Sequence, residues 1–306
     1  MYRCILAPVD GTAFGEHGLR FAATLARRSG AVLHLVHVHE SVNTPASMET
    51  LAYGGAWNDI VREQEAGYLE GLAERLTRGH AIRVETRIVE GQVAAALAAC
   101  ARECGVGLVV MSTHGRSGLG RLWHSRVAEQ LSREAGLPLL LVRPGDAEEE
   151  PELAREPELR RVLIPLHGSG GGGAVMDQAI ELGRLFRARF TLLQVVLPAF
   201  ALGGRLRRNP AELHHELMRA QTSARQYANA VAERMRAAGL EVEALVRFAP
   251  NTAAAIVGLV ASRPAGEAFD MIVMETQGHH PHPRFLSGPT SEMVAKQARL
   301  PVLAVQ

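Results

Sequence analysis

Two glycine-bearing segments of the sequence have residue types that could hold a phosphate. Gly115 follows the apolar run Leu108–Met111, and Gly278 follows the apolar run Met271–Met274. Glycine allows the backbone to turn sharply and lets its N–H groups approach an anion. A helical segment follows each glycine, and the N-terminus of a helix favours negative charge. Both segments are therefore candidate phosphate-binding loops.

A group of histidines in the second half could face the same crevice as Gly278. The group consists of His167, His279, His280 and His282. Neutral imidazole is a common ligand of zinc and copper. The spacing matches no established metal signature, and two prolines interrupt the segment. We therefore favour a solvated loop and predict no metal site, with metal binding and phosphate contact as alternatives.

The glycine run Gly168–Gly173 matches the pattern Gly-x-Gly-x-x-Gly after a strand-like segment. A dinucleotide site also needs an acidic residue at the end of the next strand. That strand end reads Gln194 to Leu197 and contains no acidic residue. A flexible loop is favoured over a nicotinamide or flavin site, with anion binding at the following helix as another alternative.

The sequence contains no recognisable catalytic constellation. The Gly-x-Ser-x-Gly pattern is absent, and no paired carboxylates end matched strands. Cys100 and Cys104 are one helical turn apart and are interpreted as reduced thiols rather than a redox pair or half a metal site. His37 and His39 share one face of a strand, with His34 on the other, and are interpreted as structural. We expect no catalytic residues and no enzymatic activity, with a hydrolase or transferase as the least favoured alternative.

The candidate residues lie on a unit that the sequence contains twice. Leu108–Gly115 resembles Met271–Gly278 at a spacing of 163 residues, and Leu137–Pro144 resembles Leu300–Gln306 at the same spacing. Near the start of each half, the segment from Ile5 resembles the segment from Val162 at a spacing of 157 residues. Three matched segments in the same order indicate a duplication. Between the copies, residues 146–159 are acidic and contain prolines, which predicts a linker between domains 1–145 and 160–306.

Each half alternates strand-like and helix-like segments. The strands of the first half are expected at Arg3–Val9, Val32–His39, Ile82–Val89, Leu108–Met111 and Pro138–Val142. The helices are expected at Glu16–Arg28, Arg62–Arg78, Val93–Glu103 and Val127–Ala135, with a long helix near Ala211–Ala238 in the second half. The alternation predicts an α/β fold of two tandem, doubly wound, five-stranded parallel sheets, Rossmann-like, with strand order 3-2-1-4-5. A ligand crevice is then expected beyond the carboxyl ends of the first and fourth strands.

The overall charge argues against a polyanionic partner. Lys and Arg together number 33 and Asp and Glu 32, which leaves a net charge of +1. That balance provides no general field for nucleic acid or an acidic membrane. No apolar run approaches the about 18 residues of a membrane span, and no signal-like segment opens the chain. We expect a cytoplasmic protein without nucleic-acid or membrane partners.

Four segments resemble the universal stress protein family in its tandem, two-domain form. They read ILAPVDGT, LHLVHVHE, VVMSTHGRSGLGRL and LPLLLVRP, and the resemblance covers nearly the whole chain. It implies small cytoplasmic α/β proteins that dimerise and act in stress responses. Some members bind ATP and others do not, and they are not generally regarded as enzymes.

The ATP-binding members have Gly, two residues, Gly, nine residues, and then Gly followed by Ser or Thr. The first half matches this pattern in part, with Ser112, Gly115, Ser125 and Arg126 at the four positions. The second half has Glu275, Gly278, Gly288 and Pro289, with Thr290 one place later. A carboxylate near a phosphate is unfavourable, and a proline removes a donor from the helix start.

The first half also has the family's aspartate, Asp10, where the second half has His167. The resemblance implies that Asp10 and the Val38 backbone hold ribose and adenine, while Arg116, Arg121 and Arg126 could supply positive charge. We therefore favour the first domain as the site for ATP or a related nucleotide. The candidate binding residues are Pro8, Asp10, Val38, Met111, Ser112, Gly115, Ser125, Arg126, Val127, Gly278, Gly288 and Thr290.

Two functions remain open at this point. The first is a stress-response regulatory protein that binds a nucleotide. The alternative is an interaction module without nucleotide, acting through the divergent loops Ser41–Asn58 and Pro198–Pro210 and the dimer surface. The apolar edge strands Leu139–Val142 and Val302–Val305 are expected to pair within one chain as a pseudo-twofold, and a homodimer and an unidentified protein partner are further expectations.

Overall fold

The computed structural model describes residues 2–39, 48–113, 120–143, 151–166, 173–197, 210–275 and 289–305. The chain divides into two units, Met1–Pro157 and Glu158–Gln306. No helix within the described ranges is long and apolar enough to cross a membrane.

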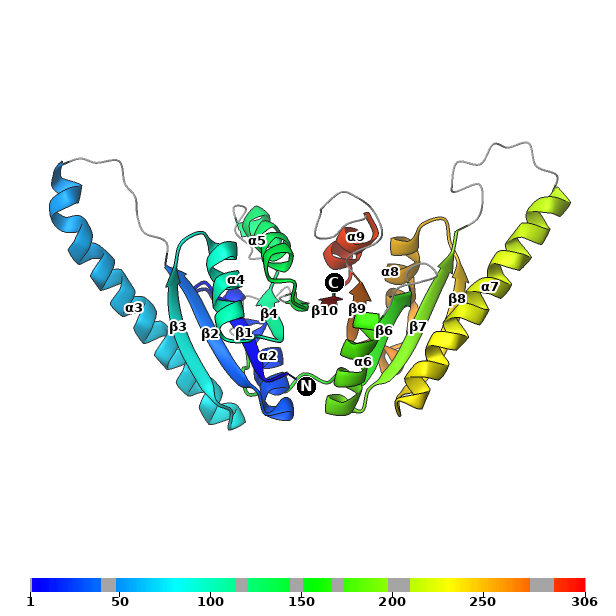
Figure 1. Ribbon diagram of the computed structural model, residues 1–306, viewed down its shortest axis with the longest axis horizontal. Helices are drawn as coiled ribbons and strands as arrows, with labels where there is room; N and C mark the ends of the chain where they lie inside the picture. Colours follow the sequence, from blue (N-terminus) through cyan, green and yellow to red (C-terminus); the bar gives the residue numbers. More distant parts are fainter. Residues whose placement is uncertain are drawn as a thin grey trace. The chain divides into compact units, whose positions relative to one another are not determined.

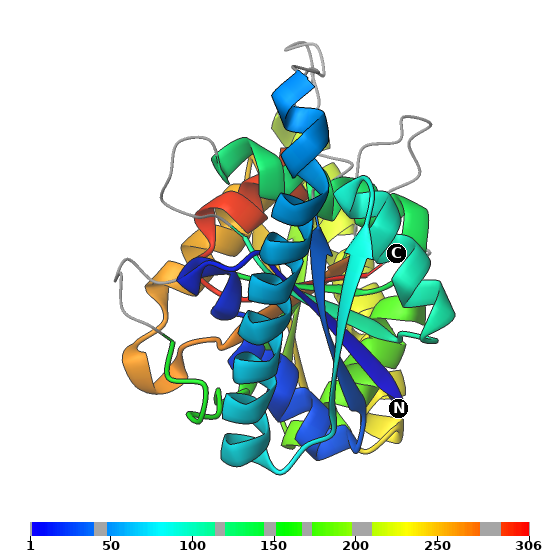
Figure 2. The ribbon, with the colours of Figure 1, turned by 90° about the vertical axis from the view of Figure 1, so that its left-hand side faces the viewer.

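The first unit is a parallel sheet with helices on both faces. Its elements are β1 (Cys4–Val9), α1 (Ala13–Glu16), α2 (Leu19–Ser29), β2 (Val32–His39), α3 (Met48–His80), β3 (Val84–Glu90), α4 (Val93–Glu103), β4 (Leu108–Ser112), α5 (Gly120–Ala135) and β5 (Leu139–Val142). The strand order is β3-β2-β1-β4-β5 and all pairings are parallel, which confirms the predicted doubly wound topology (Figure 1). Helices α2 and α3 contact each other, as do α4 and α5, and α3 runs antiparallel to the strands (Figure 2).

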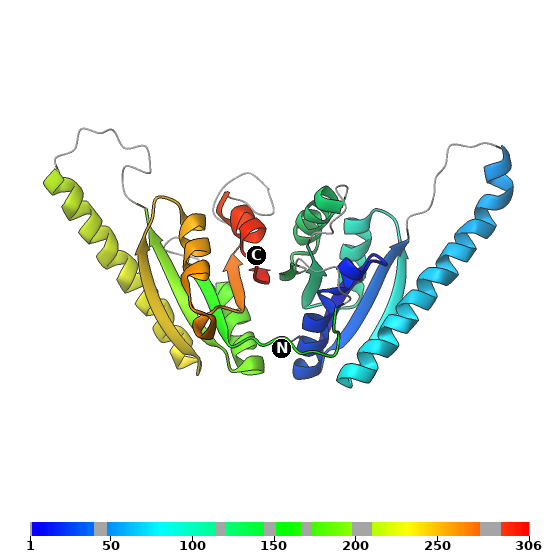
Figure 3. The same ribbon diagram turned by 180° about the vertical axis from the view of Figure 1, so that it is seen from behind.

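The second unit repeats this architecture. Its elements are β6 (Arg161–Leu166), α6 (Gly173–Phe186), β7 (Arg189–Val196), α7 (Pro210–Ala237), β8 (Glu241–Phe248), α8 (Thr252–Ser262), the 3-10 helix η2 (Ala265–Glu267), β9 (Met271–Glu275), α9 (Pro289–Gln297) and β10 (Val302–Val305). The order β8-β7-β6-β9-β10 is again 3-2-1-4-5, with α7 lying along β7 and β8 (Figure 3). The sequence repeat is therefore a repeat of structure.

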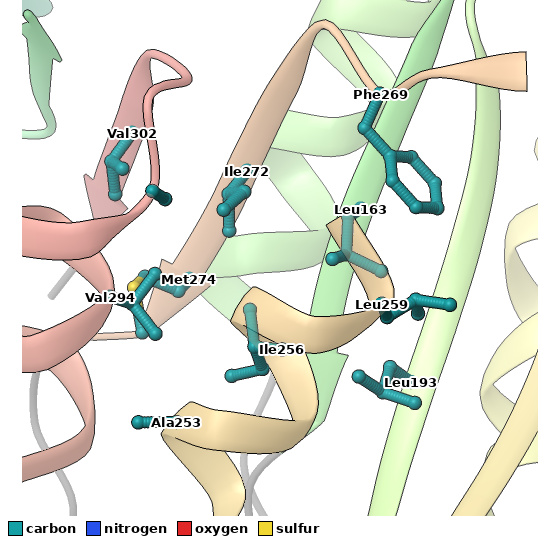
Figure 4. Close-up of a cluster of buried hydrophobic side chains, with 11 residues drawn as sticks. Leu163, Leu193, Ala253, Ile256, Leu259, Phe269, Ile272, Met274, Val294 and Val302 are labelled. Carbon is teal, nitrogen blue, oxygen red and sulfur yellow. The ribbon is translucent and has the colours of Figure 1, made fainter. Parts of the chain in front are cut away.

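Burial is complete in β4 and in the edge strands β5 and β10. This explains why these strands read as unbroken apolar runs rather than as alternating ones. In the second unit, Ile256 and Leu259 of α8 pack with Ile272 and Met274 of β9 and with Val294 of α9 (Figure 4). This packing holds β9 between α8 and α9 in the core of the second unit.

Two helices of the first unit begin earlier than the sequence-based expectations. Helix α3 begins at Met48 rather than Arg62, so residues 48–58 are helical and the prediction of a loop there was wrong. Two apolar residues of this helix, Trp57 and Ile60, are exposed. They interrupt the one-sided apolar pattern by which a helix is predicted from sequence, so the start of α3 was missed. Helix α5 begins at Gly120 rather than Val127.

The expected single helix at Glu16–Arg28 is instead two helices, α1 and α2. Thr12 caps α1 by accepting a hydrogen bond from the Gly15 N–H at 3.1 Å. The Gly18 N–H at the start of α2 donates to the Ser112 hydroxyl of β4 at 2.8 Å. The break therefore depends on a contact with a strand that lies far away in the sequence.

The segment between the two sheets is packed against the first unit over its described part, residues 151–157. Leu153 is buried, and its carbonyl accepts a hydrogen bond from His80 Nε2 at the end of α3 at 2.5 Å. Glu156 forms ion pairs with Arg27 and Arg28 of α2. Partial burial would raise the pKa of Glu156, but the hydrogen bonds and charges of Arg28 and Arg27 outweigh it and hold that pKa below its usual value.

Candidate functional site

A cavity of about 280 Å³ lies at the carboxyl ends of β1, β2 and β4 in the first unit. This is the position that the strand order predicts for a ligand. The lining residues are Pro8, Val9, Asp10, Gly15, Val36, His37, Val38, Glu65, Val93, Leu97, Met111, Ser112 and Val127. The cavity combines apolar walls with a few polar groups, as small-molecule sites usually do.

Asp10 is held in a fixed position at the end of β1. Its Oδ1 atom accepts hydrogen bonds from the Thr12 N–H at 3.1 Å and from the Thr12 hydroxyl at 2.6 Å. Gly11 has a φ of 78°, which allows the chain to turn sharply between the two residues. Gly15 lies directly against the carboxylate, because a Cβ atom there would be 2.3 Å from Asp10 Oδ1.

Ser112 lines the cavity, but its hydroxyl binds the protein's own backbone. The Oγ atom accepts a hydrogen bond from the Gly18 N–H at 2.8 Å and donates one to the Gly15 carbonyl at 3.1 Å. Ser112 therefore connects β4 to the α1–α2 junction. Its role as a ligand contact stays a prediction.

Glu65 of α3 is the second carboxylate in the cavity wall. Its Oε1 atom is 3.2 Å from His37 Nε2, and its Oε2 atom is 2.9 Å from His39 Nδ1. His37 Nδ1 also donates to the Val9 carbonyl of β1 at 2.9 Å. The three side chains join β1, β2 and α3 beside the cavity, and the structural role expected of the two histidines stays a prediction.

A polar cluster around the buried Glu16 carboxylate lies between α1 and α3. The Glu16 carboxylate accepts hydrogen bonds from the Tyr68 hydroxyl at 3.1 Å and from Arg75 at 3.2 Å. The Glu16 side chain is only 8% exposed. Burial, together with the Glu16 and Asp10 carboxylates, raises the pKa of the Tyr68 hydroxyl, so Tyr68 remains a donor.

Six of the nine candidate residues in the first half line the same cavity. They are Pro8, Asp10, Val38, Met111, Ser112 and Val127. Gly115 lies outside the described residues. Ser125 and Arg126 lie in the second turn of α5 and not directly before its start, and their side chains are outside the described part. Their contribution to a site stays a prediction.

Sequence reasoning did not identify several of the lining residues as part of a site. Val36, Val93 and Leu97 have the apolar pattern of any core-facing residue, so their pattern does not separate lining from core. Glu65 lies in a helix rich in charged residues, where one glutamate resembles the next. The pair of histidines at the end of β2 was the one available signal, since a buried imidazole needs a partner.

The second unit has different residues at the corresponding strand ends. Gln194 of β7 lies beside Leu166 of β6, as His37 lies beside Val9 in the first unit. The Gln194 Oε1 atom is buried without a hydrogen-bond partner among the described residues. Burial raises the pKa of Tyr227 on α7, with Arg234 acting against this shift and the Glu275 carboxylate adding to it.

One candidate binding residue of the second half, Thr290, lies among the described residues. Gly278, Gly288 and the four histidines His167, His279, His280 and His282 lie outside the described residues. Thr290 is in the first turn of α9, directly after Pro289 at its first position. Among the described residues, no group of three or more His, Cys, Asp or Glu side chains is arranged to hold a metal ion.

Comparison with known proteins gives one family for both halves. The profile of the universal stress protein family matches residues 1–143 and again residues 158–306. A universal stress protein of Staphylococcus haemolyticus is 32% identical over 163 residues, which are 52% of this chain and 96% of that protein. Universal stress protein YxiE of Bacillus subtilis is 28% identical over 149 residues, 47% of this chain and 100% of the relative.

Two solved structures resemble the whole chain. The structure of a universal stress protein from Archaeoglobus fulgidus has a TM-score of 0.66 at 14% identity, covering 99% of this chain and 96% of that one. A universal stress protein structure from Pseudomonas aeruginosa has a TM-score of 0.58 at 15% identity, covering 99% and 93%. At such identities the likeness concerns the fold alone.

Proposed function

Because this chain belongs to the universal stress protein family, with a family domain in each half, we propose that its first unit binds ATP or a related nucleotide. The role of the chain is then regulatory, in a stress response, and consists of binding without turnover. The observation that carries the proposal is the cavity at the ends of β1, β2 and β4, with the Asp10 carboxylate fixed in its wall.

The chemistry of the cavity suits the nucleoside part of such a ligand. Val93, Leu97, Met111 and Val127 provide apolar surface for a flat base. A carboxylate such as Asp10 accepts hydrogen bonds from the hydroxyl groups of a ribose. The volume of about 280 Å³ is close to the lower limit for small-molecule sites, which fits a base and its sugar.

We propose that the segment after β4 binds the phosphates of the nucleotide. Gly115 and the basic residues Arg116, Arg121 and Arg126 follow that strand in the sequence. Arginine presents several donors to a phosphate and always carries its charge. This part of the proposal rests on the sequence.

Titration of the full-length protein with fluorescently labelled ATP tests the proposal. We expect Asp10→Ala to weaken binding by about tenfold or more, because hydrogen bonds to charged groups are among the stronger ones. Asp59→Ala, which removes an exposed carboxylate from α3, is the matched control and should bind like the wild type. Equal binding by the Asp10→Ala and wild-type proteins would exclude the site.

A further inference from the structure

We infer that Glu65 determines the specificity of the first-unit cavity by accepting a hydrogen bond from an N–H or O–H donor on the nucleoside part of the ligand. The inference rests on the proposed function, and it adds to the site a helix, α3, that the sequence motifs do not include. The donor is either the exocyclic amine of the base or a ribose hydroxyl.

The Glu65 carboxylate is positioned to meet a ligand. It lies in the cavity wall and its side chain is 16% exposed. The Oε1 atom lies 3.2 Å from both His37 Nε2 and His39 Nδ1, and the Oε2 atom lies 2.9 Å from His39 Nδ1. A carboxylate oxygen can accept more than one hydrogen bond. The Oε2 atom, which has a single imidazole neighbour, therefore retains capacity for a donor that enters the cavity.

His37 and His39 hold the Glu65 carboxylate in one orientation. His37 donates from Nδ1 to the Val9 carbonyl, so its ring is fixed to β1 and its Nε2 atom points at Glu65. Both contacts of His37 are hydrogen bonds only when the ring carries both protons. His39, on the same strand, is 2% exposed, and its Nδ1 atom lies within 3.2 Å of both Glu65 oxygens. A group held from two sides loses little freedom when it binds a ligand.

The described lining of the cavity is acidic. It contains two carboxylates, Asp10 and Glu65, and one imidazole near them, His37. Neither lysine nor arginine occurs among these lining residues. Such a wall repels phosphate and attracts donors, so the nucleoside and not the phosphate chain faces α3.

The second copy lacks the whole cluster. The tripeptide Ala73–Arg75 and the preceding Tyr68 recur as Ala232–Arg234 and Tyr227, at a spacing of 159 residues. At this spacing Ala224 corresponds to Glu65. The strand registers make Gln194 the equivalent of His37, and Val196, two residues later, the equivalent of His39. The fold therefore forms without the cluster, which indicates that Glu65 serves the first-unit ligand rather than the architecture.

The test compares ligands on the full-length protein by isothermal titration. The ligands are adenosine, purine riboside, which lacks the exocyclic amine, and the 2′- and 3′-deoxy forms of adenosine. We expect the wild type to bind adenosine about tenfold or more tightly than at least one analogue. The analogue that loses affinity identifies the donor that faces Glu65.

The variants are those that the second copy already contains. Glu65→Ala should reduce the affinity for adenosine to that for the disfavoured analogue and abolish the discrimination. His37→Gln and His39→Val should reduce the discrimination in part, because each releases one side of the carboxylate. Glu63→Ala, at an exposed position on the same helix, should leave it unchanged. Glu65→Met keeps the length of the side chain without its acceptor oxygens and serves if the alanine variant unfolds.

Wild-type protein that binds adenosine and all its analogues equally would overturn the inference and leave the proposed function standing. The same holds if Glu65→Ala or Glu65→Met discriminates as the wild type does. If the wild type binds neither ATP nor adenosine, the proposed function fails and the inference fails with it.

Discussion

At the scale of the residue, the position of the Asp10 carboxylate depends on a glycine. A Cβ atom on Gly15 would be 2.3 Å from Asp10 Oδ1, far inside van der Waals contact. The carboxylate cannot simply rotate away, since Oδ1 accepts two hydrogen bonds from Thr12. Gly15 is therefore expected to matter more for binding than for folding.

We predict that Gly15→Ala displaces the Asp10 carboxylate and weakens ATP binding by about tenfold or more. Gly71→Ala is the control, because Gly71 lies in α3 and a Cβ atom there would have no neighbour within 4 Å. That change should stabilise the first unit by up to about 1 kcal/mol through helix propensity. Binding by Gly15→Ala at wild-type affinity would show that Asp10 does not contact the ligand.

The two thiols of α4 should differ in reactivity. Burial, with the neighbouring Cys104 thiol adding to it, raises the pKa of Cys100 to about 11. On the order of one Cys100 thiol in a thousand is then ionised at about pH 8, and the thiolate is the reactive form. Alkylation of Cys100 should therefore be slow at about pH 8 and should accelerate as the pH rises toward 11.

Peptide mapping after timed treatment with iodoacetamide measures both sites at once. Cys104, which is more exposed, should react about tenfold or more faster than Cys100 at about pH 8. Cys104→Ser removes the neighbouring thiol and controls for its influence. Equal rates at the two sites would contradict the buried position of Cys100.

At the scale of the element, the Glu16 cluster fixes α1 to α3, the two helices that provide Gly15 and Glu65. Glu16 is buried and receives hydrogen bonds from both Tyr68 and Arg75. Without Glu16 the partly buried Tyr68 hydroxyl loses its acceptor, at a cost of about 1–3 kcal/mol, whereas the exposed Arg75 loses little. The cluster thus links the stability of the first unit to the geometry of the cavity.

We predict that Glu16→Ala lowers the free energy of unfolding of the first unit by about 1–3 kcal/mol. Both tryptophans of the chain, Trp57 and Trp123, are in the first half, so tryptophan fluorescence during urea unfolding reports on this unit alone. Glu74→Ala removes an exposed ion pair with Arg78 and should cost no more than about 0.5 kcal/mol. A smaller loss for Glu16→Ala than for Glu74→Ala would refute the role of the cluster.

Elements set by local pattern could be predicted from the sequence, and elements set by distant contacts could not. Strand β2 and helix α4 begin and end where they were expected, because β-branched runs and helical spacing mark them locally. The break between α1 and α2 depends on a hydrogen bond to the distant Ser112 hydroxyl. The start of α3 could not be predicted because its exposed apolar residues do not follow a helical pattern. These features become visible only in three dimensions.

The same limit applies to the candidate site. Asp10 and Ser112 could be identified because they follow strands whose carboxyl ends share one edge of the sheet. Glu65 could not, because its place depends on how α3 lies across β2. Nothing in the local sequence distinguishes Glu65 from Glu63, although one lines the cavity and the other is exposed.

At the scale of the whole molecule, the duplicated scaffold carries two different strand-end surfaces. The first copy has Asp10 after β1 and the cluster of Glu65, His37 and His39. The second copy has a carboxylate, Glu275, at the end of β9 and proline at the first position of α9. The proposed function therefore makes the chain asymmetric, with one nucleotide site in a protein built from two similar domains.

The stoichiometry of ATP binding to the full-length chain tests this asymmetry most directly. Isothermal titration of the wild type should give one nucleotide per chain, and Asp10→Ala should remove or strongly weaken that single site. Two nucleotides per chain would contradict the restriction to the first unit, and none would contradict nucleotide binding itself.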